Sequence, residues 1–422
     1  MLAINGGIPL RIKPFSSLPC IDHNEIDAVK ELLKAGILSK FIGSPHKDVD
    51  RMLLSSSEIL AKEYKNIEKS FLGGTYIRAF EYEWSKLINS SYCISVNSAT
   101  SGLTTALLAI KNNKESINVI TTPFSFTATV GSILTANCVP IFCDIDLDTF
   151  NISPESLEYI IKQNQNIKDF DIIIPVHWCG NAGNFDKILD IARNNTLYVV
   201  EDTAQAPLTK YKDKFLGTHG IIGVFSFNEP KNIQTGEGGM VVTNSIDLAK
   251  KCRLIRNHGE NIPDSTFVGY NFRLTEIQAA IGIEQLKKAE ELNELRRINW
   301  RYLKQEIVNN FGEFLIPQKI THEDTFNAYT ASFRFIEEII GINRDKFAEA
   351  LIAEGISVSI GIPTLLCDNK ITQKFPNNVP NARKLNKQYI GFFQIGWPNT
   401  INDMNDIIEA IKKIINNKGE LK

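Results

Sequence analysis

The chain has 422 residues, of which 43% are hydrophobic and 22% charged, and its formal net charge is −2. This length allows a large core and two domains, and the near-neutral charge gives no electrostatic reason to expect nucleic acid as a partner. No run of about 18 apolar residues occurs, and no basic segment precedes an apolar one, so we expect neither a membrane span nor a leader. The seven cysteines form no Cys-x-x-Cys pair, which argues against a metal site and fits a reducing cytoplasm.

The N-terminal region reads as an arm followed by a helix. Glycines and prolines keep residues 1–20 extended, and Asp22 and Glu25 have the spacing of a capping box, which predicts a helix that ends at Gly36. Residues 41–74 have mixed charges and a serine run, and we interpret them as an insertion. The insertion is either a surface or dimer-contacting element or one that gates the substrate. Residues 1–74 therefore form the first predicted unit.

From residue 92 the chain alternates strands with helices. Strand-like runs lie at 93–96, 118–121, 140–144, 172–176, 197–200, 222–227 and 240–243. Helix-like stretches lie at 102–111, 126–135, 154–162 and 184–193. This alternation predicts an α/β fold with a mostly parallel, seven-stranded sheet flanked by helices. Neither a Gly-x-Gly-x-x-Gly fingerprint nor a P-loop is present, so a dinucleotide fold is unsupported.

A long amphipathic stretch predicts the passage to a second domain. Thr275 and Gln278 form another capping box, and apolar residues recur at helical spacing as far as Ile298. Weaker strands at 331–335 and 357–359 and helices at 344–353 and 404–415 follow. We therefore predict a large domain at residues 75–285 and a smaller C-terminal α/β domain at residues 286–422.

Two residues point to covalent chemistry. Lys231 lies between a buried strand and a bend with three glycines in four positions, and Asp202 ends another strand, where open α/β sheets place ligand-binding groups. A Schiff-base lysine with an acid that holds a pyridinium nitrogen is the pair that pyridoxal phosphate (PLP) requires. From these residues alone, Lys231 as a surface-loop lysine and Asp202 as a helix cap remain alternatives.

Three blocks in this order carry a resemblance to a known family. They are residues 201–205 (EDTAQ), 225–239 (FSFNEPKNIQTGEGG) and 269–275 (GYNFRLT). The blocks resemble the DegT/DnrJ/EryC1/StrS family, whose members are fold-type-I, PLP-dependent aminotransferases that mostly act on keto-sugars carried by nucleotides. The similarity runs from about residue 75 to the C-terminus, with a shorter match at residues 2–40. It implies the fold-type-I transferase fold for the predicted sheet and C-terminal domain.

The resemblance also assigns roles around the cofactor ring. Lys231 forms the Schiff base and then acts as the base that moves the substrate proton, while Asp202 pairs with the protonated ring nitrogen. Gln205 contacts the 3′-oxygen. An aromatic residue is expected over the ring, and the family pattern points to Phe126 rather than Phe124, although either residue reads equally well as core.

A second group of residues is expected at the cofactor phosphate. Residues 97–102 follow a strand and open a helix, so they offer backbone amides and hydroxyls to an anion, or simply an N-cap. The resemblance implies contacts from Thr100 and Ser101 and a hydroxyl from Ser226. It also implies that Asn271 of the other subunit contacts the phosphate across the dimer interface. The resemblance therefore implies an obligate homodimer with a shared active site.

The expected reaction moves an amino group from an amino acid, with L-glutamate as the expected donor, to a nucleotide-linked keto-sugar. Lysine at position 231 separates the chain from the sugar 3-dehydratases of the same family, which have histidine there. Two alternatives stay open: another carbonyl acceptor such as a cyclitol ketone, and a non-catalytic PLP-binding sensor or structural protein. Asn228 and Trp178 depart from the residues common in the family and leave the substrate undecided. His177 is either a core histidine or a polar contact in the site.

Overall fold

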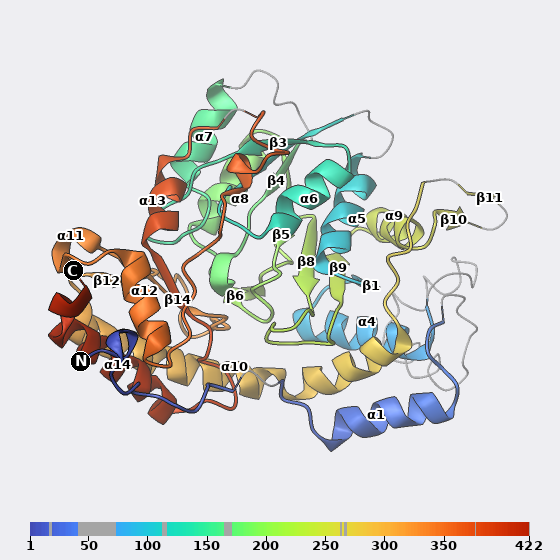
Figure 1. The fold of residues 1–422 in the computed structure, drawn as a ribbon. Helices are drawn as coiled ribbons and strands as arrows, with labels where there is room; N and C mark the ends of the chain where they lie inside the picture. Colours follow the sequence, from blue (N-terminus) through green and yellow to red (C-terminus); the bar gives the residue numbers. More distant parts are fainter. Residues whose placement is uncertain are drawn as a thin grey trace.

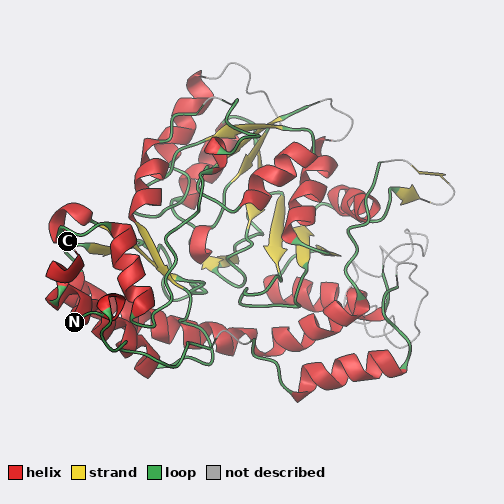
Figure 2. Ribbon diagram, in the orientation of Figure 1, coloured by secondary structure: helices red, strands yellow, loops and turns green. Residues whose placement is uncertain are grey.

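The structure, a computed structural model, describes residues 1–16, 19–40, 73–111, 116–163, 171–261, 264–265, 268–375 and 377–421. A large α/β unit and a smaller unit at the C-terminus are joined by one long helix (Figures 1 and 2). Nearly all of the predicted insertion at residues 41–74 lies outside the described residues. Among the helices that are described, none combines the length and the apolar character needed to cross a membrane.

The large unit is built on the predicted seven-stranded sheet, whose strand order is β1-β9-β8-β5-β4-β2-β3. The strands are β1 (Tyr92–Val96), β2 (Asn118–Thr121), β3 (Val139–Phe142), β4 (Ile172–Ile174), β5 (Tyr198–Asp202), β8 (Ile222–Ser226) and β9 (Gly239–Thr243). Only β9 runs against its neighbours, since its pairings with β1 and β8 are antiparallel and the other four pairings are parallel. The predicted α/β fold class is confirmed.

Both faces of this sheet are covered by helices. Alternate strand residues enter different cores: Val200 and Val224 pack with α5, α6 and α9, whereas Val199 packs with α7 and α8 and Phe225 packs with α4. The helices are α4 (Thr75–Ile88), α5 (Ala99–Lys111), α6 (Thr127–Thr135), α7 (Pro154–Gln163), α8 (Phe185–Asn194) and α9 (Ile246–Arg256). A Cβ on Gly102 would lie 2.7 Å from Val224 Cγ1, so glycine permits α5 to pack closely on β8.

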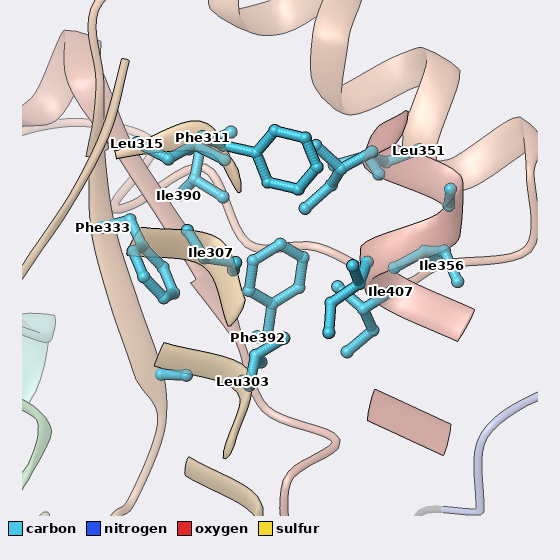
Figure 3. Packing of buried hydrophobic residues seen from close by; sticks show 14 of the residues in the cluster. Leu303, Ile307, Phe311, Leu315, Phe333, Leu351, Ile356, Ile390, Phe392 and Ile407 are labelled. Atoms are coloured by element: carbon cyan, nitrogen blue, oxygen red, sulfur yellow. The ribbon is translucent and has the colours of Figure 1, made fainter. Parts of the chain in front are cut away.

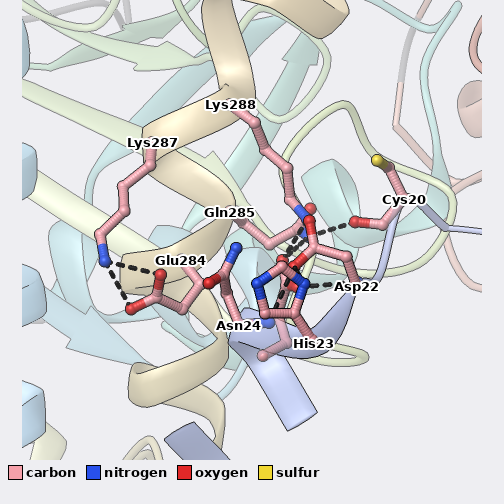
Figure 4. Close-up of polar contacts among 9 residues, drawn as sticks. Cys20, Asp22, His23, Asn24, Glu284, Gln285, Lys287 and Lys288 are labelled. Atoms are coloured by element: carbon pink, nitrogen blue, oxygen red, sulfur yellow. Dashed lines mark hydrogen bonds and ion pairs between the residues drawn. The ribbon is translucent and has the colours of Figure 1, made fainter. Parts of the chain in front are cut away.

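The N-terminal helix α1 (His23–Lys34) is fastened to the long helix α10 (Glu276–Phe311). Both predicted capping boxes are present, one at the start of each helix. Lys288 of α10 forms an ion pair with Asp22 of the α1 capping box (3.0 Å; Figure 4) and another with Glu25 (2.6 Å). Gln285 also donates to Glu25 and to the carbonyl of Cys20. These contacts fix the end of the arm against α10.

The small unit packs an antiparallel sheet against α10 and two later helices. Its strands are β12 (Leu315–Pro317), β13 (Ala331–Phe335) and β14 (Tyr389–Phe392), and its helices are α11 (Glu337–Ile340), α12 (Arg344–Ala353), α13 (Pro380–Gln388) and α14 (Ile401–Asn416). Figure 3 shows residues of α10, of all three strands, of α12 and of α14 meeting in one apolar core. Leu2 of the arm is buried in the same core. The domain boundary predicted at residue 285 falls within α10, and this division stays a prediction.

Short elements complete the chain. They are the hairpins β6 (Lys210–Tyr211) with β7 (Lys214–Phe215) and β10 (Glu260–Asn261) with β11 (Asp264–Ser265), and the 3₁₀ turns η1 (Ala3–Asn5), η2 (Trp178–Gly180), η3 (Leu366–Asp368) and η4 (Lys418–Leu421). The strand predicted at residues 357–359 is wrong, because only Ser359 pairs, through an isolated bridge to Gly391. The strands β12 and β14 and the helix α13 were not predicted.

Candidate active site

A cavity of about 610 Å³ opens where the parallel strands end. β1, β5 and β8 point the same way, so the loops that follow them meet at one edge of the sheet, which is the usual ligand position in open α/β folds. Six of the eight predicted site residues line this cavity: Thr100, Phe126, Asp202, Gln205, Ser226 and Lys231. Ser101 and Asn271 do not.

Lys231 is held by a tight turn between β8 and β9. Its amide donates to the Asn228 carbonyl at 2.8 Å, and the turn closes at Gly236, whose carbonyl accepts from the Glu229 amide. Gly236 has φ +80°, a conformation that favours glycine. The Lys231 ammonium donates to the Tyr329 hydroxyl at 3.2 Å and lies 4.6 Å from the centre of that ring. Tyr329 comes from the small unit, so the two units meet at the amine.

Asp202 is buried at the end of β5, with 4% of its surface exposed. Its Oδ2 accepts from the Thr129 hydroxyl at 2.9 Å, and its Oδ1 accepts from the Ala204 amide at 3.2 Å. Burial raises the pKa of Asp202 above its ordinary value, against these hydrogen bonds and the charge of Lys231, which lower it. No cation among the described residues forms an ion pair with Asp202. The site therefore has a buried acid with no direct ion-pair partner among the described residues, and the charge of Lys231 only partly offsets the effect of burial.

The neighbouring acid Glu201 points to the other face of the sheet. It is fully buried and accepts from His177 Nε2 at 3.0 Å and from the amides of Gly217, His219 and Gly220. Burial acts to raise the pKa of Glu201, but the hydrogen bond and charge of His177 and the Gly220 amide hold it below its ordinary value. His177 is 1% exposed and does not line the cavity, so it is the core histidine of the two readings left open by the sequence.

The turn before α5 brings a helix N-terminus to the cavity. Ser98, Ala99 and Thr100 line it, and the Thr100 side chain is exposed. The Ser101 hydroxyl instead lies within hydrogen-bond distance of Asn97 Oδ1 (2.5 Å) and of the Ser98 carbonyl, either of which can accept its one proton, so it serves the turn. A Cβ on Gly239 would lie 2.8 Å from the Ala99 nitrogen, so only glycine lets β9 start against this turn.

The remaining predicted residues occupy different walls. Gln205 Oε1 accepts from the Cys179 amide at 2.7 Å, and its NH₂ group has no partner among the described residues. Ser226 is buried at the end of β8, on the face of the sheet that Asp202 shares. Phe126 is 68% exposed at the cavity, whereas Phe124 is fully buried against Trp178. Phe126 is thus the one of the two that is free to stack on a ligand ring.

Asn271 lies outside the cavity of its own subunit. Tyr270 and Phe272 stack in parallel with ring centres 4.8 Å apart, and Asn271 between them is exposed. Its carbonyl accepts from Asn97 Nδ2 at 3.4 Å, so the segment adjoins the turn before α5. The Asn271 side chain is therefore open to a second subunit, and its assignment across an interface stays a prediction.

Among the cavity residues that were not anticipated from the sequence, two contact the predicted catalytic side chains: Thr129, which holds Asp202, and Tyr329, which holds Lys231. Thr129 reads as an ordinary helical threonine, and Tyr329 lies in a loop far from Lys231 in the chain. Ser98, which also lines the cavity, belongs to the run at residues 97–102 that was predicted to offer amides and hydroxyls to an anion.

The site fits the cofactor that the resemblance implies. A buried carboxylate without a direct ion-pair partner among the described residues suits a protonated ring nitrogen, an exposed phenylalanine suits the ring, and a helix N-terminus with an exposed hydroxyl suits a phosphate. The amine of Lys231 opens onto the same space as these groups. The arrangement can thus hold an aldehyde cofactor and take a proton beside it.

Comparison with known proteins agrees with this geometry. The model of the DegT/DnrJ/EryC1/StrS aminotransferase family matches residues 56–411. An uncharacterized protein of Methanocaldococcus jannaschii, MJ1066, is 35% identical over 352 residues, which cover 80% of this chain and 89% of the relative. The spore coat polysaccharide biosynthesis protein SpsC of Bacillus subtilis is 29% identical over 419 residues, or 94% of this chain and 96% of SpsC.

Solved structures share the fold. DesI, determined in the presence of its TDP-sugar product, superposes with a TM-score of 0.83 at 22% identity, covering 100% of this chain and 97% of DesI. Helicobacter pylori PseC, an aminotransferase involved in pseudoaminic acid biosynthesis, gives a TM-score of 0.80 at 24% identity, covering 96% and 100% of the two chains.

Proposed function

Because the chain belongs to the DegT/DnrJ/EryC1/StrS aminotransferase family and is a PLP-dependent aminotransferase, we propose that it transfers the amino group of L-glutamate to a nucleotide-linked keto-sugar. One observation carries the proposal: Lys231 and the buried Asp202 open onto one cavity at the carboxyl edge of the sheet. The names of two relatives support a sugar acceptor, since SpsC is a polysaccharide biosynthesis protein and DesI was solved with a TDP-sugar.

We propose that the cavity residues divide the cofactor between them. The α5 N-terminus and Thr100 would bind the phosphate, with Ser226 adding a hydroxyl. Phe126 would cover the ring, and Gln205 would donate its unpartnered NH₂ group to the 3′-oxygen. Ser101 would bind the phosphate only by exchanging a partner within the turn, because its hydroxyl is engaged there and its amide donates to Ser98 Oγ at 3.1 Å.

The chemistry then depends on two side chains. When bound, PLP supplies an electron-poor ring that stabilises the negative charge left when the substrate carbon loses its proton. Asp202, ionised, would accept a hydrogen bond from the ring nitrogen and would keep that nitrogen protonated. Lys231, as the free amine, would take the proton from the substrate carbon that bears the nitrogen and would return it to the carbon on the other side of that nitrogen. The Tyr329 hydroxyl can accept a hydrogen bond from the Lys231 nitrogen. The two half-reactions use the same amine in ping-pong order.

Half-reactions with the aminated enzyme test the acceptor. The enzyme is first converted to its amino form with L-glutamate, and a panel of nucleotide-linked 3-keto and 4-keto sugars and one cyclitol ketone is then offered. We expect a sugar nucleotide to restore the visible absorbance of the lysine-bound cofactor. Restoration by the cyclitol ketone alone would replace the proposed acceptor. A cofactor band that no amino acid bleaches would instead favour a sensor or structural role.

Thr129→Val should shift the acid limb of activity upward by about one pH unit, the scale of one hydrogen bond to a charged group. The valine removes a donor that lowers the pKa of Asp202. Asp202 would then take up its proton at a higher pH, and the protonated acid cannot hold the ring cation. The measurement is kcat/KM and PLP retention against pH. Thr129→Ser keeps the hydroxyl and should behave as the wild type; equal profiles for all three proteins would contradict this role of Thr129.

Mixing two inactive variants should restore activity if Asn271 serves the neighbouring subunit. We expect Asn271→Ala to weaken PLP retention, and hybrids with Lys231→Ala subunits to contain one site in which both residues are intact. The measurement is turnover after co-refolding, at a limiting PLP concentration at which Asn271→Ala alone is inactive, compared with each parent alone. Hybrids no more active than the parents, despite mixed dimers by mass spectrometry, would argue against the shared site and its obligate homodimer.

A further inference from the structure

A second cavity, of about 310 Å³, adjoins the first at Lys231. Pro230, Lys231, Tyr329 and Phe393 line both cavities. The other walls come from the arm, from α10 and from the loop after β14. The contacts of Gln285 with Cys20 and Glu25, drawn in Figure 4, hold the arm where it closes this space. The amine is thus accessible from a smaller compartment as well as from the cofactor site.

Arg296 of α10 lines this second cavity. Its Nη1 donates to the Tyr329 carbonyl at 3.3 Å. A Cβ on Gly396 would lie 2.6 Å from the guanidinium carbon, so glycine at 396 leaves the room that the guanidinium occupies. The side chain is therefore held in place from two sides, by a hydrogen bond and by close backbone packing.

Arg296 differs from its neighbours on α10 in having no acidic partner. Arg297 pairs with Glu290 and Glu294, and Arg301 pairs with Glu294 and Asp324. None of the described acidic side chains forms an ion pair with Arg296. Burial lowers the pKa of Arg296 to about 10. It remains a cation at neutral pH. A desolvated guanidinium without a counter-charge is costly, and a bound anion would remove that cost with up to two parallel hydrogen bonds.

The position of Arg296 relative to the Lys231 amine indicates which kind of anionic ligand fits the smaller cavity. Lys231 meets the hydroxyl end of Tyr329, and Arg296 meets its carbonyl end, so the two cations address opposite ends of one tyrosine. Because the donor's amino group takes the place of Lys231 on the cofactor, a donor that also reaches Arg296 needs an anionic group several bonds from its amine. The apolar side chains of Leu292, Phe393 and Trp397 in the cavity wall suit a short methylene chain between them.

We propose that Arg296 binds the side-chain carboxylate of an acidic amino donor and thereby selects L-glutamate over neutral amino acids. This inference rests on the proposed function, because it assigns a donor to the same reacting amine. The carboxylate enters the smaller cavity, and the larger one is left to the cofactor and the acceptor. The diphosphate of a nucleotide is the other anion that could bind Arg296, so the experiment must distinguish binding of a carboxylate from binding of a diphosphate.

The test compares Arg296→Met with Arg301→Met, a control on the same helix whose arginine lies outside the cavity and pairs with acids. The first half-reaction is followed with L-glutamate and with L-alanine. For Arg296→Met we expect kcat/KM for glutamate to fall by about 10- to 100-fold, as for loss of a hydrogen bond to a charged group, with alanine changed little. Arg296→Lys should recover part of the loss, because lysine keeps the positive charge but cannot donate the two parallel hydrogen bonds of a guanidinium. An unchanged glutamate-to-alanine ratio would overturn the proposal.

Calorimetric titration gives a readout that needs no turnover. Glutarate, which has two carboxylates and no amino group, should bind the wild-type holoenzyme and the Arg301→Met protein alike and bind Arg296→Met at least about tenfold more weakly. Weaker binding of a nucleoside diphosphate with unchanged glutarate binding would assign the guanidinium to the acceptor and reject the proposal. If the wild type bleaches with no amino acid, the proposed function fails, and the glutarate titration still decides whether Arg296 binds a carboxylate.

Discussion

Lys231→Ala should lower kcat by at least about 10⁴-fold. Loss of a general base alone costs up to about 10⁴-fold, and this amine also forms the covalent link to the cofactor. The variant should still bind PLP, since the phosphate and ring contacts do not involve this side chain. The checks are steady-state turnover, PLP content after dialysis, and borohydride reduction, which fixes the cofactor to the wild type and should fix none to the variant.

Lys287→Ala is the matched control. That lysine is exposed on α10 and pairs with Glu284, so its loss should leave turnover and reduction unchanged. Wild-type turnover in Lys231→Ala would remove the residue from the mechanism. Loss of folding would show as loss of bound PLP together with a lowered unfolding temperature, which separates that case from loss of chemistry.

Asp202→Asn should reduce kcat by about 10³-fold, the scale of removing one preorganised electrostatic partner. Asparagine has nearly the same shape and can still accept from Thr129, but it cannot carry the negative charge that keeps the ring nitrogen protonated. PLP should also dissociate more readily. The measurements are turnover and the dissociation constant for PLP; near-normal values for both would contradict the role of Asp202.

The same substitution should stabilise the cofactor-free protein. Burial raises the pKa of Asp202, so its ionised form destabilises the folded state at neutral pH; this cost decreases as the pH falls through the folded-state pKa and is gone below the lower pKa of the unfolded chain. Asparagine removes the cost at all pH values. The gain in unfolding temperature of the apoprotein should therefore be largest near neutral pH and absent in acid, a readout that does not depend on activity.

The large sheet could be predicted because its strands are short apolar runs between strong helix and turn signals. All seven were placed to within a few residues. The small unit was harder, since β14 packs beside chain more than fifty residues away, and its partner β13 decides that Tyr389 to Phe392 is a strand. Residues 357–359 look just as strand-like locally but find only one bridge.

The site divides in the same way. Lys231, Asp202 and Gln205 follow strands within recognisable blocks, so their meeting could be expected from a parallel sheet. The contacts of Thr129 with Asp202 and of Tyr329 with Lys231 join residues 73 and 98 positions apart, and no local pattern marks them. Ser101 shows the limit of a motif: it was predicted to bind a phosphate, a role that stays a prediction, but in the structure its hydroxyl helps to build the turn and does not line the cavity.

The continuity of α10 has a consequence for motion. This single 36-residue helix contacts α1 and α4 at one end and forms part of the small-unit core at the other. A hinge requires backbone torsions that are free to rotate, and an unbroken ladder of helical hydrogen bonds supplies none. Admission of substrate is therefore expected to depend on rearranging rim loops, such as the one around Gly361 with φ +91°, rather than on swinging one lobe away from the other.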